Sequence, residues 1–372
     1  MCISEDSLLQ EPTDSTVASS DSSDASDDHD WNDASPARLT PKLKRLSTSL
    51  SEGSSFYETS STAFSLVKVC LAGLASAAGM VAFSLWLPFA LAPHAASKTY
   101  HWAFYSYDPK LSVFDNTAWT YCTDYALAVV MAVLASTILR YSKNPLTCSL
   151  CWRSASLLLG YAASVSAGAL AHQYYLTVED RNTWGFQFLW TICVGTVTAA
   201  STAMGLSGSQ VVQQFQEISS PKSRLHRLSV VHDTFWWAFG GLVTIVCIAG
   251  GMSFQRPACD IFIAGITQTP SSFYMMLLFG LVNHPHVKMW ARIMGIVAFI
   301  LNAPLLPMYP LLVQYTDWSL ATINTLLHCW LCVAWSMQGI SMRHMIRALT
   351  LHQQEQLKSR KSSWGTILVL YP

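Results

Sequence analysis

Apolar runs of about 20 residues recur along the chain beyond residue 63, with polar segments between them. An α-helix needs about 20 apolar residues to cross a hydrocarbon core about 30 Å thick. Each run is therefore predicted to span a membrane, which indicates an all-α, polytopic transmembrane helix bundle. The eight predicted spans cover residues 67–92, 119–140, 154–175, 186–206, 234–254, 260–283, 290–313 and 319–341.

The composition also indicates a membrane protein with polar ends. Of the 372 residues, 51% are hydrophobic and 12% are charged, whereas a soluble domain has about 25% charged residues. Residues 1–60 hold 12 acids, 4 bases and 20 Ser or Thr, and such a segment buries too little apolar surface to offset the entropy of ordering. We expect a disordered, acidic, Ser-rich cytosolic tail (1–63), a leading transmembrane helix with an outer loop (64–118), a seven-helix core (119–341) and a basic cytosolic tail (342–372).

The basic residues predict the orientation of the bundle. With the amino terminus on the cytosolic side, the inner segments carry 18 Lys or Arg and the outer loops carry 4. Short cytoplasmic loops are enriched in Lys and Arg. This asymmetry predicts an integral membrane protein with both termini in the cytosol.

Three predicted spans carry strongly polar side chains at similar depths. Asp124 lies about five residues from the outer end of the second span, and His172 about three from that of the third. Asn324 and His328 lie five and nine residues into the eighth span. At 1.5 Å of rise per residue, all four lie roughly 5 to 14 Å below the outer boundary. Ionisable groups within spans mark functional sites by default, so we predict a polar site in the outer half of the bundle.

Other residues extend this predicted layer. Cys332 continues the helical stripe of Asn324 and His328 at spacings of four residues. Asn302 precedes a proline-rich part of the seventh span, and Trp190 lies near the start of the fourth. Each residue also has a structural interpretation: a membrane histidine that bonds a neighbouring carbonyl, an aspartate that caps its helix, an asparagine that joins helices, or a cysteine that packs.

Two chemical interpretations of the polar layer remain open. Two imidazoles and a carboxylate are ligand types that suit Zn²⁺, and an open position would hold a water activated to attack an ester or amide. Asp124 would then be a ligand or would orient a ligating imidazole. The same groups would alternatively relay protons in a carrier.

At these residues the chain resembles the seven-helix superfamily of alkaline ceramidases and progestin/adiponectin receptors, and most closely its uncharacterised members. The resemblance covers about residues 119–341 and rests on TDYALA around Asp124, the G-x-x-x-H of Gly168 to His172, Trp190, the N-x-x-x-H of Asn324 to His328, and Gly339. It implies a seven-helix core preceded by one added helix.

In ceramidase-like members of this superfamily, one histidine and a His-x-x-x-His pair hold zinc, and a serine lies one turn before the first histidine. The resemblance places His172 and His328 at two of these ligand positions. Cys332 stands where the second histidine of the pair would be, and Gly168 stands where the serine would be. A thiolate is able to ligate zinc, whereas the missing serine weakens the case for amidase chemistry.

The remaining motifs limit the function classes. The chain contains no Walker motif, nucleotide-binding glycine pattern or GxSxG. Its basic carboxyl-terminal segment follows a span directly, which favours contact with anionic membrane lipids over nucleic acid. We therefore expect a metal-dependent hydrolase of a lipid amide or ester or, alternatively, a non-enzymatic receptor-like protein that binds a small lipid, or a proton-coupled carrier.

Overall fold

The computed structural model describes residues 63–91, 116–181, 183–251 and 263–369. The chain divides into two units, residues 1–60 and 61–372, and the described residues all belong to the second. The predictions made for the acidic tail and for most of the first outer loop lie outside the described residues. Within the described ranges the chain forms helices and no strand, so the all-α prediction is confirmed.

The described residues form ten helical elements with defined bounds. They are α2 (Ala63–Leu91), α3 (Ala118–Leu139), α4 (Pro145–Tyr174), α5 (Val178–Arg181), α6 (Trp184–Ile218), the 3₁₀ helix η1 (Arg224–Arg227), α7 (Asp233–Gly251), α9 (Thr269–Leu281), α10 (Met289–Tyr315) and α11 (Leu320–Val369). A short helical stretch, 263–267, precedes α9. Each predicted span coincides at least in part with one of these helices.

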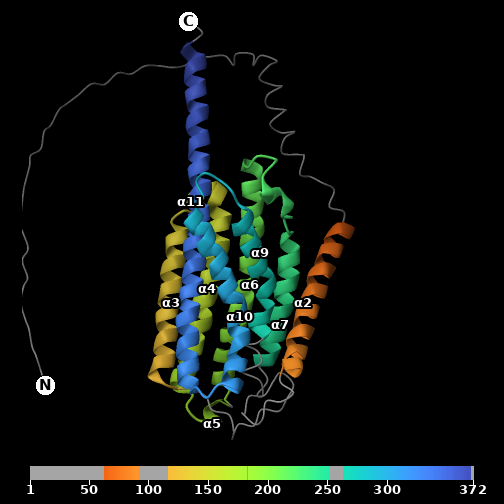
Figure 1. The fold of residues 1–372 in the computed structure, drawn as a ribbon, viewed down its shortest axis with the longest axis vertical. Coiled ribbons are helices and arrows are strands. Elements are labelled where there is room, and N and C mark those ends of the chain that lie inside the picture. Colours follow the sequence, from red (N-terminus) through yellow and green to blue (C-terminus); the bar gives the residue numbers. More distant parts are fainter. Residues whose placement is uncertain (1–62, 92–115, 182, 252–262, 370–372) are drawn as a thin grey trace, which may run out of the picture. The chain divides into compact units, whose positions relative to one another are not determined.

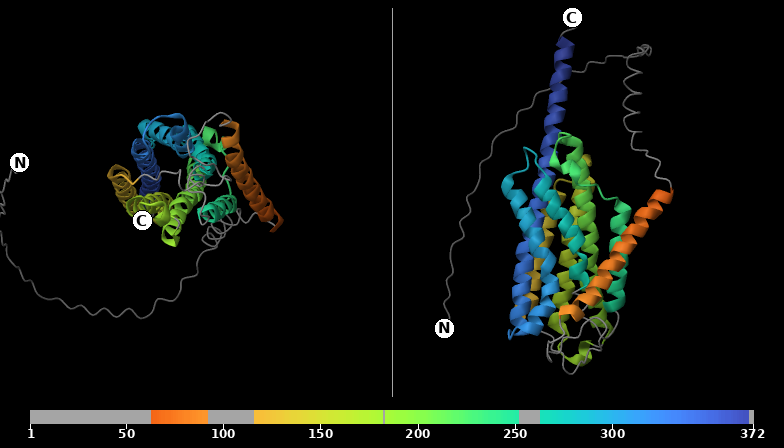
Figure 2. Two further views of the ribbon diagram at one scale, coloured as in Figure 1. Left: turned by 90° about the horizontal axis from the view of Figure 1, so that it is seen from below. Right: turned by 45° about the vertical axis from the view of Figure 1, so that its right-hand side comes forward.

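Six long helices form a closed ring. In ring order, α3 packs on α4, α4 on α6, α6 on α9, α9 on α10, α10 on α11, and α11 on α3. Helix α7 packs against the outside of this ring on α6, and α2 packs on α7. Figure 1 shows the helices side by side, and the view from below in Figure 2 shows the ring. The ring brings α3 and α11, which are distant in sequence, into direct contact.

Local sequence signals explain where two ring helices begin. The Asn144 side chain accepts a hydrogen bond from the Leu146 backbone N–H, and Pro145 occupies the first turn of α4. Thr183 caps α6 by accepting from the Phe186 N–H. Both arrangements satisfy an N–H that has no partner within its helix.

Several helices extend well beyond the spans predicted from apolar runs. Helix α4 begins at Pro145 rather than 154, α6 continues to Ile218 rather than 206, and α11 continues to Val369 rather than 341. The extensions of α6 and α11 are rich in Gln, Glu, Lys and Arg, which favour helix almost as strongly as Leu does. The extension of α4 instead begins at Pro145, after the Asn144 cap. An apolar run identifies the part of a helix that is suited to lipid. The helix itself extends beyond that run wherever the following residues also favour helix.

Among the residues that the structure describes, four helices are long and apolar enough to cross a membrane: Leu66–Ser84, Ala118–Leu139, Pro145–Tyr174 and Trp184–Ile218. The described parts of the other four predicted spans are helical but do not meet that criterion; Asp233–Ala249 and Met289–Pro304 are apolar but shorter. Large apolar side chains also remain exposed on the bundle, among them Val129 (63% exposed) and Ile245 (65% exposed). These features are compatible with a membrane protein, because lipid covers such side chains without penalty.

Candidate functional site

The candidate site is built around a carboxylate and an imidazole that meet between α3 and α11. His328 Nε2 lies 3.2 Å from Asp124 Oδ1. Asp124 is 2% exposed and His328 is 9% exposed. Asp124 comes six residues after the first residue of α3, and His328 eight after the first of α11, which corresponds to about 9 and 12 Å along the helix axes. Two ionisable side chains therefore share one buried position.

Thr123 fixes the orientation of the imidazole. Its Oγ1 lies 3.0 Å from His328 Nδ1, and the same hydroxyl donates to the carbonyl oxygens of Trp119 and Thr120 at 2.7 and 2.8 Å. The single hydroxyl hydrogen is thus directed to the helix backbone, and the oxygen accepts from Nδ1–H. A neutral His328 then carries its proton on Nδ1, which leaves Nε2 as an acceptor toward Asp124.

This arrangement makes Asp124 and His328 a proton-sharing pair. With a neutral imidazole, a protonated Asp124 donates to Nε2; after proton transfer, a carboxylate faces an imidazolium. Both forms satisfy the same contact, so the pair binds one proton without changing its geometry. While Nδ1 keeps its hydrogen, loss of the shared proton leaves an acceptor facing an acceptor, which is unfavourable in a buried site.

Small and weakly polar groups of α4 and α6 close the site on its other side. A Cβ atom added to Gly168 would lie 3.6 Å from Asp124 Oδ2 and 3.5 Å from Cys193 Sγ. Ser164, one turn before Gly168, donates to the Cys193 carbonyl oxygen at 2.6 Å. These are ordinary contact distances, so a small side chain at position 168 lets α4 pack against the carboxylate.

Of the other predicted site residues, Asn324 and Cys332 lie on the same helix as His328, whereas Trp190 lies in a separate cluster. Asn324 is buried (5% exposed) one turn before His328. Cys332, one turn after it, packs against the apolar core. His172 is partly buried one turn after Gly168 on α4. Trp190 lies in a separate small aromatic cluster, where it stacks on Phe186.

Asn302 belongs to a different polar network. Its amide nitrogen donates to Gln268 Oε1 and Ser272 Oγ, both at 3.2 Å. Its oxygen accepts from Trp335 Nε1 at 2.7 Å, and Trp335 stacks on Tyr161 with ring centroids 3.9 Å apart. These contacts join α4, α10, α11 and the start of α9 at the centre of the ring, so Asn302 has a structural role.

Sequence reasoning missed Thr123 and Cys193. Thr123 is adjacent to Asp124, and its position one residue before a membrane carboxylate was the available signal. Cys193 lies three residues after Trp190 on α6, the helix that packs on α4. Neither residue type is ionised in ordinary conditions, so a search for charged groups in spans passes over both.

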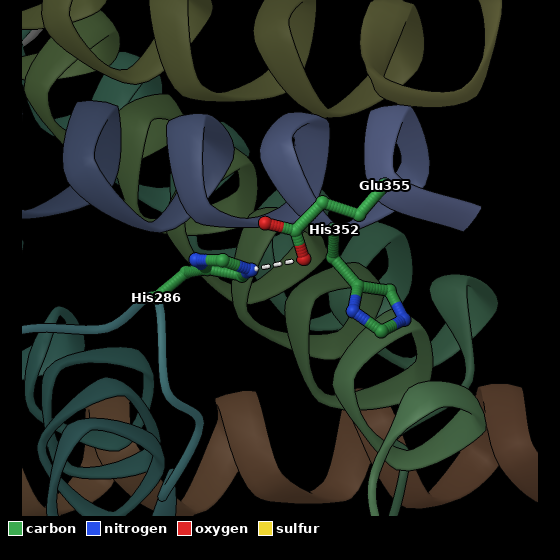
Figure 3. Close-up of side chains that lie close together, drawn as sticks. All are labelled: His286, His352 and Glu355. Carbon is green, nitrogen blue, oxygen red and sulfur yellow. Dashed lines mark hydrogen bonds and ion pairs between the residues drawn. The ribbon is translucent and has the colours of Figure 1, made fainter. Parts of the chain in front are cut away.

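The predicted zinc ligands are not part of the candidate metal set found among the described residues. Among the residues that the structure describes, one set of His, Cys, Asp or Glu side chains brings three ligand atoms within 4.8 Å of one another: His286, His352 and Glu355. This set lies at the other end of the bundle, where the connection between α9 and α10 lies beside the extended part of α11. Figure 3 shows its three side chains. His172, His328 and Cys332 form no such set, and a zinc role for them remains a prediction.

Comparison of the chain with protein-family models, with curated proteins and with solved structures gives no match. The resemblance to the ceramidase and receptor superfamily is thus neither supported nor contradicted by these comparisons.

Proposed function

We propose that the chain is a multi-pass membrane protein in which Asp124 and His328 bind a proton reversibly, as in a proton-coupled carrier. The observation that supports this proposal is the 3.2 Å contact between His328 and Asp124, whose side chains are 10% and 3% exposed. Ionisable groups inside membrane bundles are costly and pair with one another along proton and substrate pathways.

The pair also provides a means of coupling. It joins α3 to α11, and its stability depends on whether a proton is present between Oδ1 and Nε2. With the proton bound, the two helices are held by a hydrogen bond or ion pair. Without it, two acceptors face each other in a medium of low dielectric, so separation of the helices or entry of a polar ligand group becomes favourable. A small lipid or other largely apolar molecule with one polar group suits such a site.

Metal-dependent hydrolysis is the second candidate, favoured by one observation. His172 lies one turn after Gly168 on α4. A Cβ atom added to Gly168 would lie 3.6 Å from Asp124 Oδ2, so this part of α4 is next to the carboxylate. A His172 ring directed at the pair would complete a set of one carboxylate and two imidazoles. Such a set would hold zinc and supply an activated water for attack on an ester or amide.

Infrared difference spectroscopy between pH 4 and pH 9 tests the proton-binding proposal on the full chain in lipid nanodiscs. We expect a carboxyl C=O band that titrates in the wild type and disappears in Asp124→Asn. His328→Gln should shift the same band, because it removes the proton-sharing partner. Glu179→Gln changes a carboxyl group in the short helix α5, outside the pair, and should leave the band unchanged. A spectrum that Asp124→Asn does not alter would contradict the proposal.

Elemental analysis of the same preparation separates the two candidates. The carrier proposal predicts no zinc that depends on His172 or His328. Stoichiometric zinc that is lost in both His172→Ala and His328→Ala would instead favour the hydrolase and overturn the proton-coupled proposal.

A further inference from the structure

A pocket of about 790 Å³ lies at the end of the bundle opposite the Asp124–His328 pair. Its walls come from the segment after α6, the connection between α9 and α10, and the extended part of α11. The volume is within the range of pockets that bind small molecules. In the predicted orientation this end of the bundle faces the cytosol.

The lining of this pocket is strongly positive. Lys222, Arg224 and Arg292 line it, and Glu355 is the one carboxylate among its lining residues. Glu355 is already engaged by His286, whose Nε2 lies 2.9 Å from Oε2. None of the three cationic side chains forms an ion pair with a residue that the structure describes. Three positive charges therefore converge on a space without a counter-charge of their own.

The cationic walls are held in place by backbone contacts. The Gln216 side chain donates to the carbonyl oxygens of Leu225 and Leu228 at 3.0 and 2.7 Å, which ties η1 to the end of α6. Arg292 donates through Nε and Nη2 to the carbonyl oxygens of Phe279 and Gly280. These bonds leave Nη1 available. A prearranged wall loses less entropy when a ligand binds.

Neutral donors complement the cations. Burial, together with neighbouring His352 and His286, lowers the pKa of His284 to about 4, so its ring is neutral near pH 7. Its Nδ1 accepts from the His286 backbone N–H at 3.4 Å, which leaves the proton on Nε2 as a donor. The hydroxyl groups of Ser219, Ser220 and Ser223 also line the pocket.

Charge decides between a metal cation and an anion as the occupant. His286, His352 and Glu355 bring three ligand atoms within 4.8 Å of one another, and Figure 3 shows the Glu355 carboxylate directed at the His286 ring with His352 beside it. A divalent cation bound there would enter a pocket that already carries three uncompensated positive charges. Multiple charged donors and hydroxyl groups instead match the oxygens of a phosphate group.

We propose that this pocket binds a phosphomonoester, either on the headgroup of a membrane lipid or on a soluble compound, through Lys222, Arg224 and Arg292. The position of the pocket fits a headgroup. Met289 and Trp290 begin α10 beside it and are 63% and 49% exposed, as expected of side chains at a membrane interface. Basic pockets between helices on the cytoplasmic side are suited to phosphorylated headgroups.

Isothermal titration of the purified full chain in detergent tests this proposal. The probes are dioctanoyl phosphatidylinositol 4,5-bisphosphate, inositol 1,4,5-trisphosphate, dioctanoyl phosphatidylcholine and Zn²⁺. We expect binding of one or both phosphomonoester probes and none of phosphatidylcholine. Preference for the lipid probe identifies a headgroup site, and equal affinity for the two identifies a site for the phosphate group alone. The double variant Lys222→Glu/Arg224→Glu should weaken binding by about 30-fold or more, because each cation near such a site contributes about fivefold.

Arg227→Glu is the matched control, since Arg227 is exposed on the same loop but does not line the pocket. Its affinity for the phosphomonoester probes should remain within about twofold of the wild type. A melting temperature measured for each variant establishes folding, and Lys222→Ala/Arg224→Ala replaces the double charge reversal if that variant unfolds. Equal weakening by Arg227→Glu would overturn the proposal, because binding would then reflect general surface charge. So would the absence of phosphomonoester binding together with stoichiometric Zn²⁺ binding lost in His286→Ala.

Discussion

Removal of the Asp124 carboxylate should destabilise the contact between α3 and α11 by a measurable amount. In Asp124→Ala, His328 keeps the contact of Nδ1 with Thr123 and loses the contact of Nε2 with the Asp124 carboxylate. A buried polar atom left without a partner costs about 1–3 kcal/mol, and breaking a charged buried pair costs about 3–5 kcal/mol. Since His328 is able to become neutral, the lower range applies. We expect a loss of about 2 kcal/mol in the free energy of unfolding.

Asp124→Asn should lose less than about 1 kcal/mol, because its amide is able to donate a hydrogen bond to Nε2 in place of the protonated carboxyl. A double-mutant cycle isolates the pairwise contribution. Unfolding free energies of the wild type, Asp124→Ala, His328→Ala and the double variant would be measured by SDS titration in bicelles. We expect a coupling energy of about 1–2 kcal/mol, above the average of about 0.6 kcal/mol for hydrogen bonds between membrane helices.

A neighbouring hydrogen bond supplies a matched control cycle. Tyr125 Oη donates to Gln173 Oε1 at 2.7 Å between α3 and α4, in a partly buried position. Tyr125→Phe and Gln173→Ala should couple by less than about 0.6 kcal/mol. A coupling energy for Asp124 and His328 below about 0.3 kcal/mol, within the error of independent sites, would refute the argument that the pair is desolvated and mutually dependent.

Three further predictions follow from particular contacts. Gly168→Ala should be tolerated, because its Cβ would meet Cys193 and Asp124 at ordinary contact distances of 3.5 and 3.6 Å, whereas Gly168→Leu should lower the melting temperature and abolish the titrating carboxyl band. Asn302→Ala should lower the free energy of unfolding by about 2–3 kcal/mol by leaving buried partners unsatisfied, while exposed Asn283→Ala should change it by less than about 0.5 kcal/mol; equal effects would contradict the network. The free energy of unfolding should fall as the pH decreases from about 6.5 to about 4, because His284 is protonated in the unfolded chain but not in the folded chain. Urea or SDS titration of His284→Gln should show a smaller pH dependence of that free energy in the same window. An unchanged dependence would exclude His284 as the cause.

The fold class was predictable because membrane-length apolar runs have few alternative structures. The predicted span 119–140 differs from α3 by one residue at each end. The ends of α4, α6 and α11 were less predictable, since polar residues such as those of 342–369 continue a helix as readily as apolar ones. The acidic tail and most of the first outer loop lie outside the described residues.

The similar depths of Asp124 and His328 predict that the two side chains meet. The predicted spans that carry them begin at the same boundary, and each residue lies a few residues from that boundary. Depth along a helix does not specify the rotation of that helix about its axis. This rotation determines that Cys332 packs against the apolar core and that Asn302 contacts Gln268 and Trp335. The cationic pocket was harder still to foresee. Its side chains come from three segments that the sequence separates by more than 50 residues, and only the ring arrangement brings them together.

The most direct test of the central claim is the protonation state of the His328 ring. Site-resolved ¹⁵N solid-state NMR of the full chain in lipid would report Nδ1 and Nε2 separately. The account predicts that Nδ1 carries a proton throughout the titration and that the Nε2 signal changes with pH in the wild type but not in Asp124→Asn. A His328 ring whose two nitrogen signals respond to pH identically in both proteins would contradict a shared proton between these residues.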